Sequence, residues 1–557
     1  MQLPPDHARV RMVTRRLWIA WLIGAMALLA WGAWLRFALP QAPVIDRDVE
    51  GYLGPSVSAL SGHHFVHMIG RSFPYPAFVY GILRVSGDFR AIAVIQHLMG
   101  VAAGLLILLA WNAAGRMVPV GGVPKPVYPF LGFAPAFTYL VSRRMILFEH
   151  QIRPEAIFSF LGILTLWVSF LFLEARFVRP RKSAAFWFGA LNVFLACLLY
   201  EMKPSFGFAA LFCTLPVWIS LIAPGVAPNR LALLAAAILP AFVLLVLPER
   251  SLKKSDGLAV VFLPETLFTI HAPIIEKQME EDLAGGGPLP YPRQFLQSAH
   301  DLLRTELATA SRMTTPRPFA SLGTNPDYLM YEHSFCWKLV NVYHLTRPQV
   351  AAFCFTYYRR ALLHHPVWMI SKVLRQLLLV YQLKCPIYWT GHITELSNDH
   401  YAHVAELIQH TASVGPGLPI VTRYVDECVR LGKEKIVMTQ SNAFDLWLRV
   451  LGGLYLLTFI VALASPFLLF RSAEMRAHFF WFIAALWLAF GFNFGNCLTI
   501  AIVHTLEVTR YVHVQLLFAV FAEWLTFYFL LELAALRFRA RLGATAPPHS
   551  APEHATD

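Results

Sequence analysis

Long apolar runs separated by short polar stretches dominate this chain. The first extends from Leu17 to Pro40, directly after the basic sequence RVRMVTRR. Most runs reach the roughly 17–25 residues that a helix needs to cross a bilayer. The others lie at 89–111, 126–142, 154–174, 184–200, 204–223, 229–248, 444–470, 477–501 and 511–536. The pattern predicts an all-α polytopic membrane protein with about ten transmembrane helices, within a range of about nine to thirteen.

Composition supports this fold class. Of the 557 residues, 57% are hydrophobic and only 14% are charged, against about 25% charged in soluble proteins. A water-soluble globule could not bury so much apolar surface, so a soluble enzyme is excluded. The seven cysteines form no CxxC pair, which argues against a zinc ribbon or a thioredoxin-like site. The formal charge of +13 comes largely from the ends of apolar runs, so we expect no nucleic-acid partner.

Basic clusters orient the chain. Arginines precede the first run, and further basic clusters follow the fourth, eighth and tenth runs. All of them fall on one side if the N-terminus is cytoplasmic, which predicts that both termini are cytoplasmic. The run at 366–383 is interrupted by Lys372 and Arg375, and a crossing there would invert every later helix. We therefore expect 350–385 to contain an amphipathic helix lying in the outer membrane interface.

Four parts of the chain follow from these assignments. They are an N-terminal transmembrane module at 1–248 with external loops at 41–88 and 143–153, a mainly α-helical external region at 249–443, C-terminal transmembrane helices at 444–541, and a disordered tail at 542–557.

The first external loop carries the first candidate chemistry. Asp46, Asp48 and Glu50 lie within five residues in APVIDRDVEGYL. Such carboxylates could hold a divalent cation or supply a general base, and a solvated acidic loop start explains them equally well. Arg71 and Tyr75 follow in RSFPYPAFVYGIL. Arg71 is either an anion ligand or a positive residue at the interface.

The next external stretch, SRRMILFEHQIRPEAIFSF, combines acids with arginines. Glu149 and Glu155 lie near Arg143, Arg144 and Arg153. Glu155 begins an apolar run directly after a proline, where an acid complements the helix dipole. The alternative is a second carboxylate that faces the same cavity as the first-loop acids. The three arginines break the positive-inside rule, which favours a function for them.

Two further cations stand at the ends of apolar runs. Lys203 follows Glu201 near membrane depth, where a charge is costly unless it is paired or solvated. It belongs either to a local ion pair or to a phosphate clamp. Arg510 and Tyr511 precede the last run. They form either a bidentate phosphate clamp or an interfacial anchor. No Walker A loop occurs, so direct use of ATP is not expected.

At these residues the sequence resembles the GT-C superfamily of integral-membrane glycosyltransferases, in particular the lipid-carrier-dependent aminoarabinose transferases and protein O-mannosyltransferases. Asp46-Arg47-Asp48 stands where that superfamily has an acidic motif in its first external loop. The family often has a tyrosine four residues after the acid, and Tyr52 stands in that position after Asp48. Three other stretches are similar: RSFPYP resembles R-x-P-x-Y-P with altered spacing, Glu155 in RPEAIF resembles the second-loop acid, and TRYVHVQ resembles the closing Arg-Tyr helix. The segment 249–348 matches nothing in that family.

The resemblance implies a function. A sugar on a polyprenyl phosphate would be transferred, with inversion, to a hydroxyl of a glycan, lipid or protein on the periplasmic face of a bacterial inner membrane. The implied catalytic residues are Asp48 as general base, Asp46 and Glu155. The implied phosphate ligands are Arg510 and Lys203, with Arg71, Arg143 and Arg144 in reserve. The implied substrate contacts are Glu50, Tyr52, Tyr75, Glu149 and Tyr511. No cofactor is required, although Asp46 and Asp48 could hold Mg²⁺, Mn²⁺ or Ca²⁺.

Two other classes remain open. A flippase or polysaccharide transporter would place charges along a path inside the bundle, whereas these acids lie in external loops. A non-catalytic membrane scaffold with a large external binding region is the second alternative.

Overall fold

The computed structural model describes residues 5–46, 48–66, 71–118, 122–222, 230–255, 262–313, 319–388, 396–410 and 417–541. Within these ranges, nine helical segments are long and apolar enough to cross a membrane, which confirms the all-α polytopic class. They are Arg15–Phe37, Arg90–Gly115, Glu155–Val178, Lys182–Met202, Pro204–Ile222, Arg230–Lys253, Asn442–Phe470, Ala473–Val503 and Leu516–Arg539. The predicted tail at 542–557 lies outside the described residues. Which face is cytoplasmic stays a prediction.

The helices of the first half are α1 Pro5–Phe37, α2 Val49–Leu60, α3 Pro74–Ser86, α4 Arg90–Gly115, α5 Tyr128–Leu131, α6 Phe133–Val141, α7 Arg143–Glu149, α8 Glu155–Leu173, α9 Lys182–Met202, α10 Gly207–Ile222, α11 Arg230–Ala241 and α12 Leu247–Ser255. Those of the second half are α13 Leu263–Ile270, α14 Ala272–Ala284, α15 Arg293–Arg312, α16 Pro326–Tyr331, α17 Phe335–Asn341, α18 Arg347–His364, α19 Pro366–Leu378, α20 Asn398–His410, α21 Pro419–Leu431, α22 Asn442–Ala464, α23 Ala473–Val503, α24 Thr509–His513 and α25 Leu516–Arg541. Strands β1 Leu396–Ser397 and β2 Val437–Met438 pair antiparallel.

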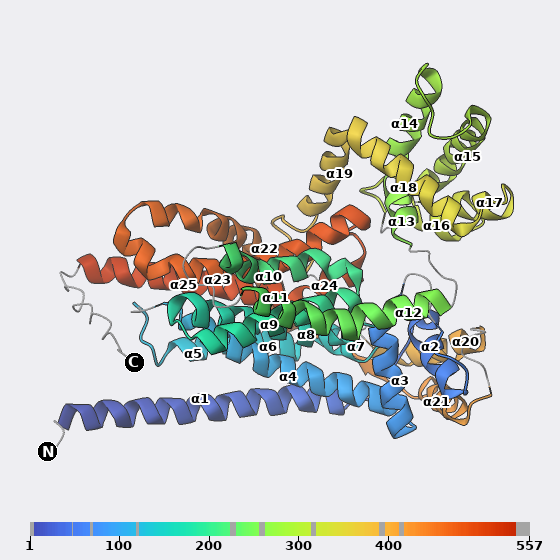
Figure 1. Cartoon of the computed structure of the whole chain (residues 1–557). Helices are drawn as coiled ribbons and strands as arrows, with labels where there is room; N and C mark the ends of the chain where they lie inside the picture. The colour runs from blue at the N-terminus through green and yellow to red at the C-terminus, as the bar shows by residue number, and fades with distance from the viewer. Residues whose placement is uncertain are drawn as a thin grey trace.

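The predicted third span, 126–142, is a broken segment rather than one helix. It consists of α5 and α6, which meet at Gly132, and α7 follows after Ser142. Gly132 allows a close approach to the Trp111 ring, since a Cβ atom there would lie 2.8 Å from that ring. The Ser142 hydroxyl accepts a hydrogen bond from the Met145 N–H and so starts α7. In sequence order α5, α6 and α7 still lead from one end of the bundle to the other (Figure 1).

The two ends of the bundle differ. The beginning of α1 and the end of α25 lie at one end, and the group of helices α13–α19 projects at the other (Figure 1). The connections between α1 and α2 and between α7 and α8, which carry the candidate acids, also lie toward this second end. We call it the loop end and the first one the terminal end.

The predicted external region 249–443 is not one body. Its beginning still belongs to the span Arg230–Lys253. Helices α13–α18 share a core of their own around Phe268, Phe335 and Phe353. In contrast, α20 and α21 pack on the membrane module, where the ring of Tyr424 stacks on Phe89 at a centroid distance of 4.2 Å. The segment 350–385 forms α18 and α19, neither of which is long and apolar enough to span.

Candidate functional site

The first two acids are positioned by backbone pairing between two connections. The Val44 N–H donates to His150 O and the Ile152 N–H donates to Val44 O, each at 3.0 Å. The strand-like contact aligns the residues after α1 with those between α7 and α8. Asp46 then forms a close ion pair with Arg153, a residue that the sequence showed only as an unusual external arginine.

Asp48 lies between two guanidiniums from distant parts of the chain. Its Oδ1 is 2.9 Å from Arg71 Nη2, and its Oδ2 is 2.7 Å from Arg510 Nη1. Arg510 also approaches Asp46 at 3.6 Å. Burial alone would raise the pKa of Asp48, but the charges of Arg510 and Arg71 hold it below its ordinary value. Asp48 is therefore ionised at neutral pH.

Glu155 and Lys203 form a second pair beside the first. Glu155 begins α8 and makes a close ion pair with Lys203, which follows α9 where Pro204 ends the helix. The Lys203 ammonium lies 5.0 Å from the ring centroid of Tyr511, and Arg510 donates to the Tyr511 hydroxyl at 3.1 Å. The sequence alternative of a Glu201–Lys203 pair is thus not what the structure shows.

Arg71 reaches Asp48 across α2. Its guanidinium lies 4.8 Å from the ring centroid of Tyr52, and Tyr52 meets Tyr75 edge-on at 5.6 Å. Gly51 permits this route, because a Cβ atom there would lie 2.7 Å from Arg71 Cγ. Tyr52 and Tyr75 thereby support the arginine from one side.

We call the seven ionised groups the charged cluster. They are Asp46, Asp48, Glu155, Arg71, Arg153, Lys203 and Arg510. Four cations against three carboxylates leave a formal charge of +1. Glu155 Oε2 and Arg510 Nε are buried without a hydrogen-bond partner among the described residues. The cluster therefore has both surplus positive charge and unused polar atoms.

A tyrosine from the projecting helices, Tyr331, lies within electrostatic range of the cluster, although the residue is 61% exposed. Partial desolvation and the neighbouring Asp327 raise the pKa of Tyr331, and Arg71 and Tyr511 also act on it electrostatically. Tyr331 ends α16, in the part of the sequence that resembles no family. No local motif marks this residue, so the sequence analysis missed it.

Helix α19 fixes the connection that carries Arg510. Lys372 Nζ donates to Ala501 O at 2.6 Å and to His504 O at 3.2 Å. Gln376 Oε1 accepts from the hydroxyl of Thr505 at 2.8 Å and from the N–H of Leu506 at 2.9 Å. Lys372, one of the two residues that interrupt the predicted run, and Gln376, one turn further along α19, thus hold the end of α23 and the residues after it in place.

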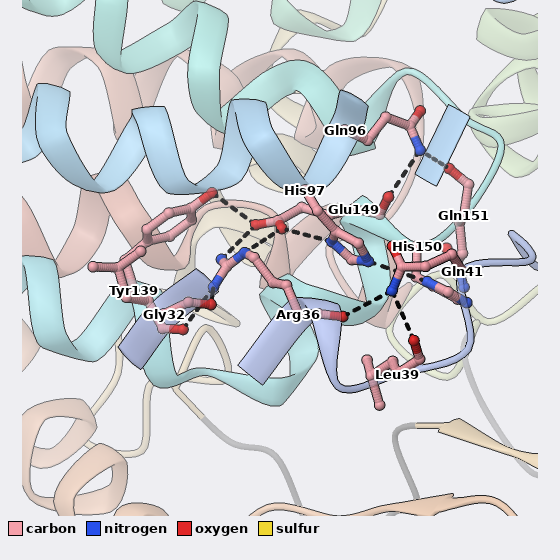
Figure 2. Close-up of polar contacts among 11 residues, drawn as sticks. Gly32, Arg36, Leu39, Gln41, Gln96, His97, Tyr139, Glu149, His150 and Gln151 are labelled. Carbon is pink, nitrogen blue, oxygen red and sulfur yellow. Dashed lines mark hydrogen bonds and ion pairs between the residues drawn. The ribbon is translucent and has the colours of Figure 1, made fainter. Parts of the chain in front are cut away.

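Glu149 does not join the charged cluster, contrary to the sequence interpretation. It lies in a buried network that Figure 2 shows, where Arg36 binds it through Nε at 2.6 Å and Nη2 at 2.7 Å. The Tyr139 hydroxyl donates at 3.0 Å and His97 approaches at 3.2 Å. His97 continues the network to His150 at 3.2 Å. Both carboxylate oxygens of Glu149 are therefore engaged by buried partners outside the charged cluster.

Three other predicted residues lie in the first turns of α7 and α2. Arg143 begins α7, has Arg36 as an electrostatic neighbour, and donates its backbone N–H to Gln440 at 2.9 Å. Arg144 follows it in the first turn of α7. Glu50 lies in the first turn of α2 with its side chain exposed.

The acids of the cluster do not fit a divalent cation. Each oxygen of Asp48 meets a guanidinium, while Asp46 uses Oδ2 for Arg153 and accepts the Asp48 N–H at 3.1 Å through Oδ1. A cation placed there would face three arginines. In the described part of the chain, no group of three His, Cys, Asp or Glu side chains is arranged to hold a metal.

Comparison with known proteins found distant likenesses only. No family model matches the chain, and no curated protein matches its sequence. Two solved structures are similar, both of ArnT from Cupriavidus metallidurans, one in the apo state and one bound to undecaprenyl phosphate. Each is 12% identical over 87% of this chain and 78% of that chain, with TM-scores of 0.30 and 0.29. A likeness this distant gives no information on the chemistry of this chain.

Proposed function

We propose that this protein is a membrane glycosyltransferase. It moves a sugar from a polyprenyl-phosphate donor to a hydroxyl of an acceptor, at the periplasmic face of a bacterial inner membrane. The observation that carries the proposal is the charged cluster, in which carboxylates and surplus cations from distant segments meet at the loop end. A lipid-linked donor is already activated, so a nucleotide site is not needed.

Asp48 is the proposed general base. It accepts the proton of the acceptor hydroxyl while that oxygen attacks the anomeric carbon from the face opposite the phosphate. The new glycosidic C–O bond forms as the bond to the phosphate oxygen breaks, and the configuration inverts. Arg510 and Arg71 hold the carboxylate ionised before the substrate arrives. A phosphate that binds these arginines competes for their charge, so Asp48 becomes more basic when the donor is in place.

Arg510 and Lys203 stabilise the leaving phosphate in this proposal. The electron pair of the broken bond stays on the phosphate oxygen, where negative charge increases. Preorganised cations are most effective at such a point, because they need no rearrangement during the reaction. Arg510 is held by Asp48 and Tyr511, and Lys203 by Glu155, so both point into the same cluster. Glu155 and Tyr331 are then placed to orient the acceptor.

The test uses purified full-length protein, a panel of polyprenyl-phosphate sugars and a membrane extract as acceptor source. Asp48→Asn should lower transfer about 10²–10⁴-fold, and Arg510→Gln about 10²–10³-fold. Asp301→Asn, a change at an exposed acid of α15, is the matched control.

Full transfer by Asp48→Asn would refute the proposed role of that residue. Absence of transfer from every donor, together with lipid movement across vesicles, would favour a transporter instead. If neither occurs, the scaffold interpretation stands.

A further inference from the structure

A second group of cations lies far from the charged cluster. Arg116, Arg179 and Arg181 surround Glu174 at 3.4, 3.8 and 3.9 Å. The carboxylate is 2% exposed, whereas each of the three arginine side chains is more than half exposed. One buried negative charge therefore faces three positive charges. The surplus of +2 is available to an anion.

A cavity of about 560 Å³ opens beside these arginines. It lies between the first half of α1 and helices α4, α5 and α8, and α5 marks the terminal end of the bundle (Figure 1). Arg116, Arg179 and Lys125 line it together with apolar side chains such as Leu105 and Trp21. We call it the basic cavity. Lys125 forms no ion pair with any residue that the structure describes, so it adds a third uncompensated charge.

Most of the wall of the basic cavity is apolar and aromatic. Trp18, Trp21 and Trp167 contribute indole rings, and Leu105 and Leu109 of α4 contribute aliphatic surface. A smaller hollow of about 160 Å³ continues along Trp18 and Trp21. A free phosphate ion would satisfy the cations but leave this wall uncovered. A ligand that fits the whole cavity has an anionic head and a hydrocarbon chain.

We propose that the basic cavity binds one anionic phospholipid of the surrounding bilayer. Its phosphate contacts Arg116, Lys125 and Arg179, and an acyl chain lies along Leu105 and the tryptophans. One guanidinium can donate two parallel hydrogen bonds to the oxygens of a phosphate. Tryptophan side chains are enriched at the depth of the lipid headgroups. Basic pockets between transmembrane helices are known to bind anionic headgroups. Cations that served orientation alone would need no cavity with an apolar wall.

The test is native mass spectrometry of the full-length protein titrated with phosphatidylglycerol or phosphatidylcholine. The wild-type chain should bind phosphatidylglycerol more tightly. Lys125→Gln should weaken that binding about fivefold, which corresponds to about 1 kcal/mol per basic residue near a lipid surface. It should leave phosphatidylcholine binding unchanged. Leu105→Trp should reduce phosphatidylglycerol binding, because the larger side chain occupies space inside the basic cavity. The matched control is Lys433→Gln, at an exposed lysine after α21.

Equal binding of the two lipids, or phosphatidylglycerol binding that Lys125→Gln and Leu105→Trp leave unchanged, would overturn the proposal. Inorganic phosphate is a separate arm of the experiment. If it protects the lipid-free protein from thermal unfolding as well as phosphatidylglycerol does, the site is an ion site and not a lipid site. Should Leu105→Trp fail to fold, Lys125→Glu, with an expected loss larger than fivefold, takes its place.

Discussion

Replacing Arg36 by methionine tests the ion pair that underlies the loop end. Arg36 is fully buried and Glu149 is 2% exposed. The pair joins α1 to the end of α7, directly before the residues that hold Asp46 and Arg153. Methionine keeps much of the volume of arginine but removes its charge. The variant therefore leaves a buried carboxylate without its cation.

The expected cost follows from the bonds that are lost. Arg36 donates two charge-assisted hydrogen bonds to Glu149, and each contributes about 1.5–3 kcal/mol. It also donates to Gly32 O and Leu140 O, both at 2.9 Å. Breaking a buried pair by removing one partner generally costs about 3–5 kcal/mol. We expect Arg36→Met to lower the free energy of unfolding by about this amount. Both groups are buried, so solvent does not screen their interaction.

The double variant Arg36→Met/Glu149→Leu separates charge from packing. Removing both ionised partners leaves no buried charge, so the double variant should recover at least half of the stability that Arg36→Met loses. The free energy of unfolding is measured in mixed detergent micelles by titration with a denaturing detergent. Measured for the wild type, Arg36→Met, Glu149→Leu and the double variant, it completes a double-mutant cycle. A loss below about 1 kcal/mol for Arg36→Met, or a double variant whose loss equals the sum of the single losses, would contradict the reasoning.

Three further changes probe the site and its support. In the proposed transfer reaction, Asp48 should stay ionised as the pH falls from about 7 to about 4, because its pKa is lowered. Arg510→Gln removes the charge that lowers this pKa most, so the acid limb of the pH–rate profile should move to higher pH. An acid limb that does not move would contradict the assignment of Asp48 as the base. Gly100→Ala places a methyl group against the buried carboxylate of α7 and should cost about 1–3 kcal/mol in the same unfolding titration, whereas Gly453→Ala, where a Cβ atom meets nothing within 4 Å, should not destabilise the protein. Gln376→Leu removes two hydrogen bonds to the connection before α24 and should lower transfer without abolishing expression; wild-type transfer would show that the connection needs no such support.

Part of the arrangement at the loop end follows from the sequence. A chain that crosses the bilayer repeatedly returns alternate connections to the same face, so Asp48, Glu155 and Arg510 could be assigned to one end from span parity and basic clusters. The structure brings them together, with Arg510 bound to Asp48 across 462 sequence positions. Parity could not show which cation meets which acid. Asp46 pairs with Arg153 because backbone hydrogen bonds join the connections before α2 and α8. Glu155 pairs with Lys203 because α8 packs on α9. No local pattern encodes either arrangement.

Hydrogen-bond satisfaction, rather than position in the sequence, distinguishes Glu149 from Glu155. Glu149 and Glu155 lie six positions apart near the same arginines, and both are almost fully buried. Glu149 has every acceptor position engaged by Arg36, Tyr139 and His97, so a ligand could displace nothing without a large cost. Glu155 retains an unused oxygen beside a cluster of positive charge. A buried polar atom without a partner is costly unless a ligand completes it, and this difference favours Glu155 over Glu149 as the acid that orients the acceptor.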